Sequence, residues 1–359
     1  QFLRLFGEAE IDLFGLVALD GAFDFRFSES DGLTAFADVN ARIGPEELNL
    51  SREATGLLVL AFHWLPPNAL VLGLLALPMA VFQSASAAID GLCLALTACA
   101  IAGFLTLRSD PDKAGRRMPA VWALILIVLV GARLNLAPLL LLPAILTLTR
   151  PRWDQALVTA ITLTAVAAWV LHAAGQVVDL RTAASSVSSI SRLQETLLSP
   201  TDFLQALAET LGNPAILVSY VAGFIGVLGW FNLPLAPSGY LALGSLLLVT
   251  AVVSFRWTDP ALPGSARLTL LFVAGLAVML VFLLLWLTWT SPGSRWIEGV
   301  QGRYFLPPAL ILAYALGTGN RDNGLSPIQH RLAITTAGSL LVITLVVTLG
   351  ALLDRYHPM

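Results

Sequence analysis

The chain has 359 residues, of which 57% are hydrophobic and 12% charged, and its formal net charge is −3. The charged share is about half that of a soluble domain, too little to keep so large an apolar surface in solution. This excludes a soluble enzyme and a secreted disulfide-rich domain, and the negative balance offers nucleic acid no basic surface. We therefore expect an all-α, polytopic membrane protein. The two cysteines and four histidines form no metal-binding motif, so no metal site is expected.

The first 53 residues differ in composition from the rest. They hold eleven acidic residues against four arginines, and no apolar run approaches the ~20 residues that a spanning helix needs. We expect an acidic extracytoplasmic segment over 1–53 with short amphipathic pieces. Pro-Glu-Glu at 45–47 is typical of a helix start, because proline fits the first turn and carboxylates suit the positive end of the helix dipole.

From residue 54 to residue 359, apolar runs alternate with short polar breaks, which predicts one multi-pass membrane domain. About ten spans are expected, some shorter than a full crossing, and 55–86 and 119–149 are typical of tight helical hairpins. The status of the apolar run 214–230 stays open. The predicted spans are 55–66, 69–86, 89–107, 119–132, 134–149, 156–174, 240–256, 267–290, 304–319 and 333–353.

Positive charges gather on one side of these spans. The breaks on that side hold ten Lys and Arg residues, and the short breaks on the other side hold four. Because cytoplasmic loops carry the excess of Lys and Arg, the first side is expected to face the cytoplasm, and 1–54 and 175–239 to face outward. This topology requires that 214–230 does not cross. The breaks rich in positive charge are 107–118, 150–155, 256–267 and 320–332.

The outer loop 175–239 contains a predicted amphipathic helix. Ser-Pro-Thr-Asp at 199–202 supplies a helix start. The apolar residues that follow have helical spacing: Phe203, Leu204, Leu207 and Leu211. This helix is expected either in the outer leaflet or packed on the protein's own outer face.

The spans carry almost no ionisable residue at mid-depth, unlike those of ion-coupled transporters. Polar groups gather instead near the predicted outer ends. Asp90 closes a polar stretch that begins at Gln83, and it either caps the next helix or positions a sugar hydroxyl or a base. Arg133 lies at the tip of the 119–149 hairpin, where it either snorkels to lipid headgroups or holds a lipid-linked phosphate.

The sharpest polar cluster is 296–307, Trp-Ile-Glu-Gly-Val-Gln-Gly-Arg-Tyr-Phe-Leu-Pro. Its glycines let the backbone approach a ligand closely. An arginine at membrane depth needs a partner, and a guanidinium suits phosphate through paired hydrogen bonds. Arg303 is therefore a candidate phosphate ligand, with Gln301 and Tyr304 as neutral donors. Alternatively, Arg303 pairs with Glu298 or Asp90 and locks the loop.

Gly-Val-Gln-Gly-Arg-Tyr-Phe-Leu-Pro at 299–307 resembles the signature of a bacterial family of predicted membrane proteins, the domain of unknown function 2142. Weaker likenesses lie at 77–90, at 226–234 (Gly-Val-Leu-Gly-Trp-Phe-Asn-Leu-Pro) and at 133–138, which replaces the family's usual Lys-Pro-Tyr-type tip. Together these stretches span about residues 50–320. The resemblance implies the GT-C superfamily of polytopic glycosyltransferases. Such enzymes move a sugar from a polyprenyl-phosphate carrier to an acceptor outside the bacterial cytoplasmic membrane, at an active site near the outer leaflet.

One part of the family pattern has no counterpart in 1–50. It is the first membrane helix with the acidic, His-containing motif in the loop that follows, which would supply the catalytic base. We expect this motif upstream of Gln1. Alternatively, an acid among Asp24, Glu29 and Asp31 substitutes for it, with Asp90 as a further candidate that orients a hydroxyl.

The expected function is glycosyl transfer from a polyprenyl-phosphate sugar to a cell-envelope glycan or glycolipid acceptor. The donor phosphate is assigned to Arg303, Gln301, Tyr304 and Arg133. No cofactor beyond the lipid-linked donor is expected, and a need for a divalent metal stays open. Two alternatives are a transporter or flippase of lipid-linked saccharides, which needs a polar path across the membrane, and a non-catalytic membrane subunit of envelope polysaccharide assembly.

Overall fold

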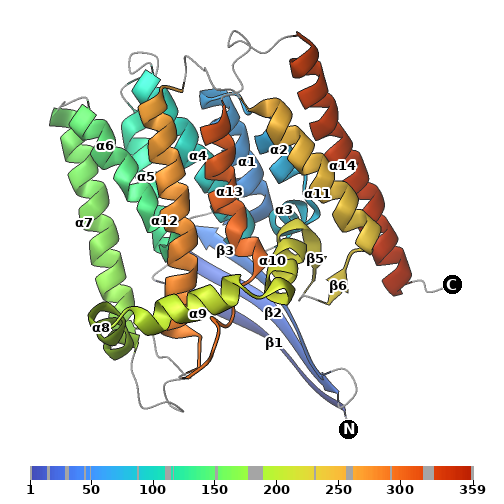
Figure 1. Ribbon diagram of the computed structural model, residues 1–359. Coiled ribbons are helices and arrows are strands. Elements are labelled where there is room, and N and C mark those ends of the chain that lie inside the picture. The colour runs from blue at the N-terminus through green and yellow to red at the C-terminus, as the bar shows by residue number, and fades with distance from the viewer. Residues whose placement is uncertain are drawn as a thin grey trace.

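The computed structural model describes most of the chain. For residues 2–52 it describes the backbone alone, and side chains are described within the later ranges. The described ranges are 2–13, 17–28, 32–43, 46–48, 50–86, 89–109, 115, 117–149, 153–176, 189–229, 232–255, 262–291, 293–317 and 327–356. The membrane part is helical, as expected, and an antiparallel sheet precedes it (Figure 1).

The sheet is formed by four strands in sequence order. They are β1 (Phe2–Leu13), β2 (Val17–Ser28), β3 (Gly32–Ile43) and β4 (Glu46–Leu48). Phe23, Phe25 and Phe27 alternate with polar residues, the period-two pattern of a strand. The helix start predicted at 45–47 is wrong, because 46–47 lie in β4 and the first helix begins at Leu50. Cross-strand pairing with β3 outweighs the local helix signal.

Five helices in the described part of the chain are long and apolar enough to cross a membrane. Each matches a predicted span, and they confirm a multi-pass membrane protein. The larger figure of about ten spans stays a prediction. The five are α4 (Ile89–Ser109), α7 (Trp153–Gln176), α11 (Pro237–Ser254), α12 (Gly264–Thr288) and α14 (Pro327–Tyr356).

The other predicted spans are built from shorter helices that begin or break at proline or at an extended residue. Pro78 starts a new helix and Pro307 lies in the first turn of another, because proline suits that position. Arg133 is extended and separates two segments of the 119–149 hairpin. The short elements are α1 (Leu50–Trp64), α2 (Ala69–Leu75), α3 (Pro78–Ala85), α5 (Met118–Ala132), the 3-10 helix η1 (Leu134–Leu140), α6 (Leu141–Thr149), the 3-10 helix η2 (Gly302–Phe305) and α13 (Leu306–Leu316).

The run 214–230 does not cross the bundle. It forms α10 (Pro214–Gly226) and β5 (Val227–Leu228), and β5 pairs with β6 (Leu233–Pro234) that follows the run. In Figure 1 these elements lie at the lower end of the bundle near α11, next to α9 (Thr201–Leu211), which runs across from α8 (Ser189–Leu198). The helix ends that flank the predicted breaks rich in positive charge lie at the opposite, upper end. The described helix ends are therefore grouped as the two predicted sets of breaks require, and we call the α8–α10 end the outer end as a label taken from the charge rule.

The core forms around α4, which is the most buried of the five long helices. Small residues let neighbours approach it: a Cβ added at Gly103 would lie 2.3 Å from the Trp122 ring. The Trp122 indole N–H donates to the carbonyl of Ala100 at 2.8 Å. Cys93 and Cys99 lie buried and unbridged in this core. The tight packing fixes the depth and rotation of α4, and hence of the acidic residue in its first turn.

Candidate functional site

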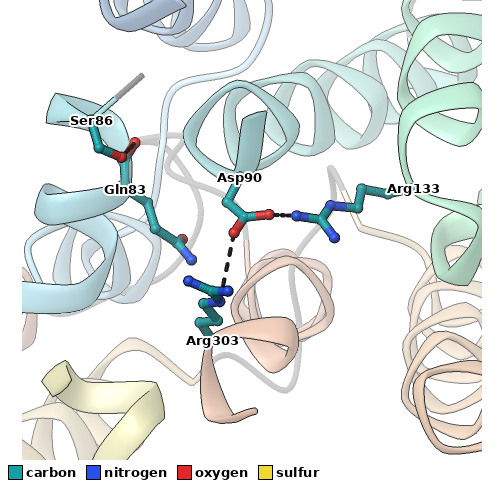
Figure 2. A network of polar contacts seen from close by, with 5 residues as sticks. All are labelled: Gln83, Ser86, Asp90, Arg133 and Arg303. Atoms are coloured by element: carbon teal, nitrogen blue, oxygen red, sulfur yellow. Dashed lines mark hydrogen bonds and ion pairs between the residues drawn. The ribbon is translucent and has the colours of Figure 1, made fainter. Parts of the chain in front are cut away.

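Asp90 lies in the first turn of α4, at the outer end of the bundle. The neighbouring Gly91 packs against α3, where an added Cβ would lie 2.4 Å from the carbonyl oxygen of Gln83. This close approach holds the buried Gln83 side chain beside Asp90 (Figure 2). As the second residue of α4, Asp90 is inside the helix rather than at the cap, and its carboxylate makes contacts with other segments.

Arg133 contributes the first of these contacts. The chain is extended at this residue, between α5 and η1, which turns the guanidinium towards the bundle. Arg133 Nη2 forms an ion pair with Asp90 Oδ1, and about a third of the arginine side chain is exposed. The alternative in which Arg133 snorkels away to headgroups is therefore wrong, because its charge is directed at the carboxylate.

The second contact comes from the 299–307 segment. Gly299 has φ +78°, and an added Cβ would lie 2.3 Å from the Trp289 ring. Gly302 meets the backbone of α10, where an added Cβ would lie 2.0 Å from the Tyr220 carbonyl oxygen. These approaches need glycine, and they bring Arg303 Nε to 3.7 Å from Asp90 Oδ2.

An aromatic group holds the same segment from the other side. The Phe305 ring lies 5.8 Å from the Tyr220 ring and 5.7 Å from the Phe282 ring, measured between centroids. These spacings are typical of aromatic pairs. They fix η2 against α10 and α12, so the position of Arg303 is determined by packing as well as by charge.

Of the two partners expected for Arg303, the structure selects Asp90. Glu298 instead accepts hydrogen bonds within its own loop, from the Ser291 backbone N–H at 3.1 Å and from the Ser294 hydroxyl at 2.9 Å. The backbone hydrogen bond from Ser291, with the serine hydroxyls, outweighs the opposing effect of burial and holds the pKa of Glu298 below its usual value. Glu298 therefore stabilises the loop that carries Arg303.

Tyr304 links the two arginines. Its ring centroid lies 5.6 Å from Cζ of Arg303 and 5.9 Å from Cζ of Arg133, within the range of cation–π contacts. Two guanidiniums, one carboxylate and one phenol ring thus converge from α4, the α5–η1 break and η2. Figure 2 shows both arginines pointing at Asp90 from different sides.

These groups line a small cavity of about 20 Å³, which has room for one water molecule. Its polar lining carries two arginines against one aspartate. Four of the candidate residues from the sequence line this cavity: Asp90, Arg133, Arg303 and Tyr304. The lining residues that carry chemistry are Gln83, Asp90, Arg133, Asn135, Arg303 and Tyr304.

The structure places the remaining candidates elsewhere. Gln301 does not line the cavity, and its buried Oε1 has no hydrogen-bond partner among the described residues. Asp24 lies in β2, opposite Phe6 and Phe36 in the strand register, and its side chain is not described. Glu29 and Asp31 lie outside the described residues. Asp90 is therefore the one proposed acid that the described structure brings to the arginines.

Two lining residues were not proposed as ligands from the sequence. Gln83 and Asn135 lie in the polar stretches around Asp90 and Arg133, so the signal was present, but neither has a charge that demands a partner. Within the described ranges, no group of three or more His, Cys, Asp and Glu side chains could hold a metal ion. The site can instead bind an anion through its guanidiniums and hydrogen-bond donors.

Comparison with known proteins identifies the chain by its family. No curated protein and no solved structure matches it. The sequence profile of the predicted membrane protein family DUF2142 matches residues 54–312, more than half of the chain. The matched region contains Asp90, Arg133 and the whole 299–307 segment. The protein that holds this cluster of two arginines and an aspartate therefore belongs to the predicted membrane protein family DUF2142.

Proposed function

We propose that this protein is a glycosyltransferase of the GT-C type, with about ten membrane segments, in the bacterial cytoplasmic membrane. It takes a sugar from a polyprenyl-phosphate carrier and places it on a cell-envelope glycan or glycolipid at the extracytoplasmic face. The observation that carries the proposal is the convergence of Arg133 and Arg303 on Asp90 at the outer end of the bundle. Paired guanidiniums at this depth suit the phosphate of a membrane-embedded carrier.

The absence of buried charge supports an enzyme over an ion-coupled transporter. Among the described side chains, the buried polar ones are amides and hydroxyls, and none is an Asp, Glu, His, Lys or Arg. Ion-coupled transport usually needs an ionisable group within the membrane. The polar cluster of this chain lies at one end, where an active site for a lipid-linked donor would be reached from the outer leaflet.

In the proposed reaction, an acceptor hydroxyl oxygen attacks the anomeric carbon of the carried sugar. The bond between that carbon and the phosphate oxygen breaks, and polyprenyl phosphate leaves with the bonding electron pair. Arg133 and Arg303 stabilise the charge that develops on the leaving phosphate, helped by the Tyr304 phenol. A carboxylate takes the hydroxyl proton, and Asp90 is the candidate that lies in the site.

The size of the cavity adds one requirement. Because about 20 Å³ holds a water molecule but no phosphate, the donor phosphate must take the place of the Asp90 carboxylate on at least one arginine. That exchange would release Asp90 from an ion pair and make its oxygen available to an acceptor hydroxyl. Donor binding and the activation of the acceptor would then be coupled through one carboxylate.

Transfer by the purified protein in lipid nanodiscs tests this function. The donors are radiolabelled polyprenyl-phosphate mannose, glucose and arabinose, and the acceptor is total envelope glycolipid. We expect label to move to the acceptor in wild type and to be lost in Arg303→Ala and Arg133→Ala. Arg331→Ala is the matched control, because Arg331 is exposed on α14 at the opposite end of the bundle.

Binding of undecaprenyl phosphate, measured on the same samples, separates the outcomes. Binding that depends on Arg303 without transfer from any donor would overturn the enzyme and leave a carrier-binding transporter or subunit. Full transfer by both arginine variants would overturn the phosphate site itself.

A further inference from the structure

The outer helix α9 has three distinct faces. Its first face packs on α12 and the 289–301 loop through Phe203, Leu207 and the fully buried Thr210. Its second face exposes Leu204 and Leu211, at 54% and 45%. The expected packing of this helix on the protein's own face is thus confirmed, and the exposed leucines leave its contact with the outer leaflet a prediction.

The third face of α9 is polar and points away from the core. Gln205, Glu209 and Gly212 follow one another at helical spacing on the side opposite the buried residues. The 289–301 loop, which packs on the first face, also reaches this polar face through Arg295. Arg295 forms an ion pair with Glu209, with Nη2 at 3.0 Å and Nε at 3.1 Å from Oε2. Two residues further on, the Ile297 backbone N–H donates to Thr210 Oγ1 at 2.8 Å.

These contacts fix Trp296 from both sides. Arg295 before it is bound to α9 by charge, and Ile297 after it is bound by a hydrogen bond and buried against Phe203 and Trp286. Trp296 itself stays 45% exposed. An aromatic ring is thus presented on a rigid backbone at the rim of a polar helix face, with little conformational freedom to lose on binding a ligand.

Trp296 and the polar face of α9 line an open groove of about 490 Å³, within the ~300–1,000 Å³ range of ligand pockets. Gln205 and Asn213 contribute carboxamides, and Glu209 and Arg295 contribute a carboxylate and a guanidinium. Because the two charges already pair with each other, the groove favours a neutral ligand over an anion. The Glu209 carboxylate still has acceptor capacity beyond one arginine.

A sugar has the complementary chemistry. Its ring presents a flat face of C–H groups, which packs on an aromatic ring, and a rim of hydroxyls, which bond to carboxamides and carboxylates. We propose that the groove of Trp296, Gln205, Glu209, Asn213 and Arg295 binds a neutral oligosaccharide at the outer surface. Its use as the acceptor subsite rests on the proposed glycosyltransferase function, and the binding itself does not.

Continuity of the chain supports that use. Trp296 and Arg303 lie on one loop, and Gly299, packed on the Trp289 ring, forms the turn between them. A glycan held at Trp296 and a carrier phosphate held at Arg303 would therefore be positioned by the same segment. A role of Trp296 as a membrane anchor alone accounts for its exposure, but not for the fixed polar groups beside it.

Oligosaccharide binding to the full chain in nanodiscs, measured by calorimetry, tests the proposal. The probes are linear tetrasaccharides of mannose, glucose and galactose. We expect at least one to bind, and Trp296→Leu to weaken that binding about tenfold, because leucine keeps the apolar surface but loses the flat ring. The control Trp153→Leu makes the same change at an 81% exposed tryptophan at the opposite end of the bundle, and binding should be unchanged.

Two further variants separate oligosaccharide binding from folding and from sugar transfer. Glu209→Leu should also weaken binding while an unchanged thermal unfolding temperature shows that the fold persists. Arg303→Ala should bind the tetrasaccharide as wild type does and lose transfer. The proposal is overturned if none of the tetrasaccharides binds at a concentration of ~20 mM, which is well above the millimolar dissociation constant of a weak complex. It is also overturned if Trp296→Leu binds the tetrasaccharide like wild type. Binding without transfer would instead overturn the glycosyltransferase alone.

Discussion

Arg133 and Asp90 form an ion pair that joins the break between α5 and η1 to the first turn of α4. The two residues come from different spans, and the contact forms because each lies where a helix ends or begins at the outer end of the bundle. Arg303 reaches the other oxygen of the same carboxylate from η2. One aspartate thus fixes three segments, and its removal has consequences for both stability and anion binding.

Asp90→Asn should lower stability and raise the affinity for a carrier phosphate. The amide leaves two guanidiniums close together without the carboxylate between them, at a cost of about 1–3 kcal/mol, below that of a fully buried pair because the arginines are about one third exposed. The amide also competes poorly with phosphate for the arginines. Undecaprenyl phosphate should bind about tenfold more tightly, a change of about 1.4 kcal/mol.

Thermal unfolding and lipid binding in nanodiscs measure these two effects together. Asp354→Asn provides the control, since Asp354 is exposed near the end of α14. Weaker phosphate binding by Asp90→Asn would contradict the exchange, and would show that the carboxylate helps to assemble the anion site.

Gly302→Ala should displace the segment that carries Arg303. The added methyl would lie 2.0 Å from the Tyr220 carbonyl oxygen and 2.3 Å from the Phe224 nitrogen, both backbone atoms that cannot rotate away. Overpacking of this kind costs about 1–3 kcal/mol, and we expect both a lower unfolding temperature and weaker phosphate binding. Gly275→Ala on α12 is the control, because nothing lies within 4 Å of its added methyl. Equal behaviour of the two variants would contradict the close packing of η2 on α10.

The sequence predicts the individual membrane helices better than it predicts the contacts between segments. Composition and apolar periodicity predicted the five long helices, and the Lys and Arg distribution predicted which helix ends lie together. The N-terminal sheet was not predicted from the sequence, although phenylalanines alternate with polar residues in β2. The proline and glutamates at 45–47 favour a helix, and β4 forms there instead. Local propensity there is outweighed by pairing between strands, which a single segment does not reveal.

In the candidate site, too, one contact can be predicted from the sequence and another cannot. A buried or interfacial arginine must find a counter-charge, so a pair between Arg303 and Asp90 was among the expected alternatives and is confirmed. That Arg133 shares the carboxylate depends on the rotation of α4 against α5. That rotation is set by contacts such as Gly103 on Trp122 and Gly91 on α3. Such contacts are distant in sequence, and neither spacing nor composition predicts them.

Glu298 should make stability depend on pH in the acidic range. Its pKa lies below the usual 4.5, chiefly because the Ser291 backbone N–H binds the carboxylate. A lowered folded-state pKa contributes stability that is present above the unfolded value and is lost as pH falls through the folded value. The unfolding temperature of wild type should therefore exceed that of Glu298→Gln at pH 7, and the difference should shrink below about pH 4.5. A difference that stays constant down to pH 3 would show that the carboxylate charge is not its source.

Thr210→Val should loosen the platform on which Trp296 rests. Thr210 is fully buried, and its Oγ1 donates to the Ala206 carbonyl at 2.7 Å and accepts from the Ile297 N–H at 2.8 Å. Valine has nearly the same shape but leaves that N–H without its acceptor, at a cost of about 1–3 kcal/mol. Tetrasaccharide binding should weaken along with stability, because the tryptophan is no longer fixed beside the polar face of α9.

Thr210→Ser separates the hydrogen bond from the packing. Serine keeps the hydroxyl and loses the methyl, so oligosaccharide affinity should return towards wild type even where the unfolding temperature does not. Thr97→Val is the matched control for threonine replacement, because the buried Thr97 hydroxyl bonds back to the Cys93 carbonyl within its own helix. If Thr210→Val and Thr97→Val bind the tetrasaccharide equally well, the hydrogen bond to Ile297 does not position Trp296, and the groove would have to be organised by the ion pair of Arg295 with Glu209 alone.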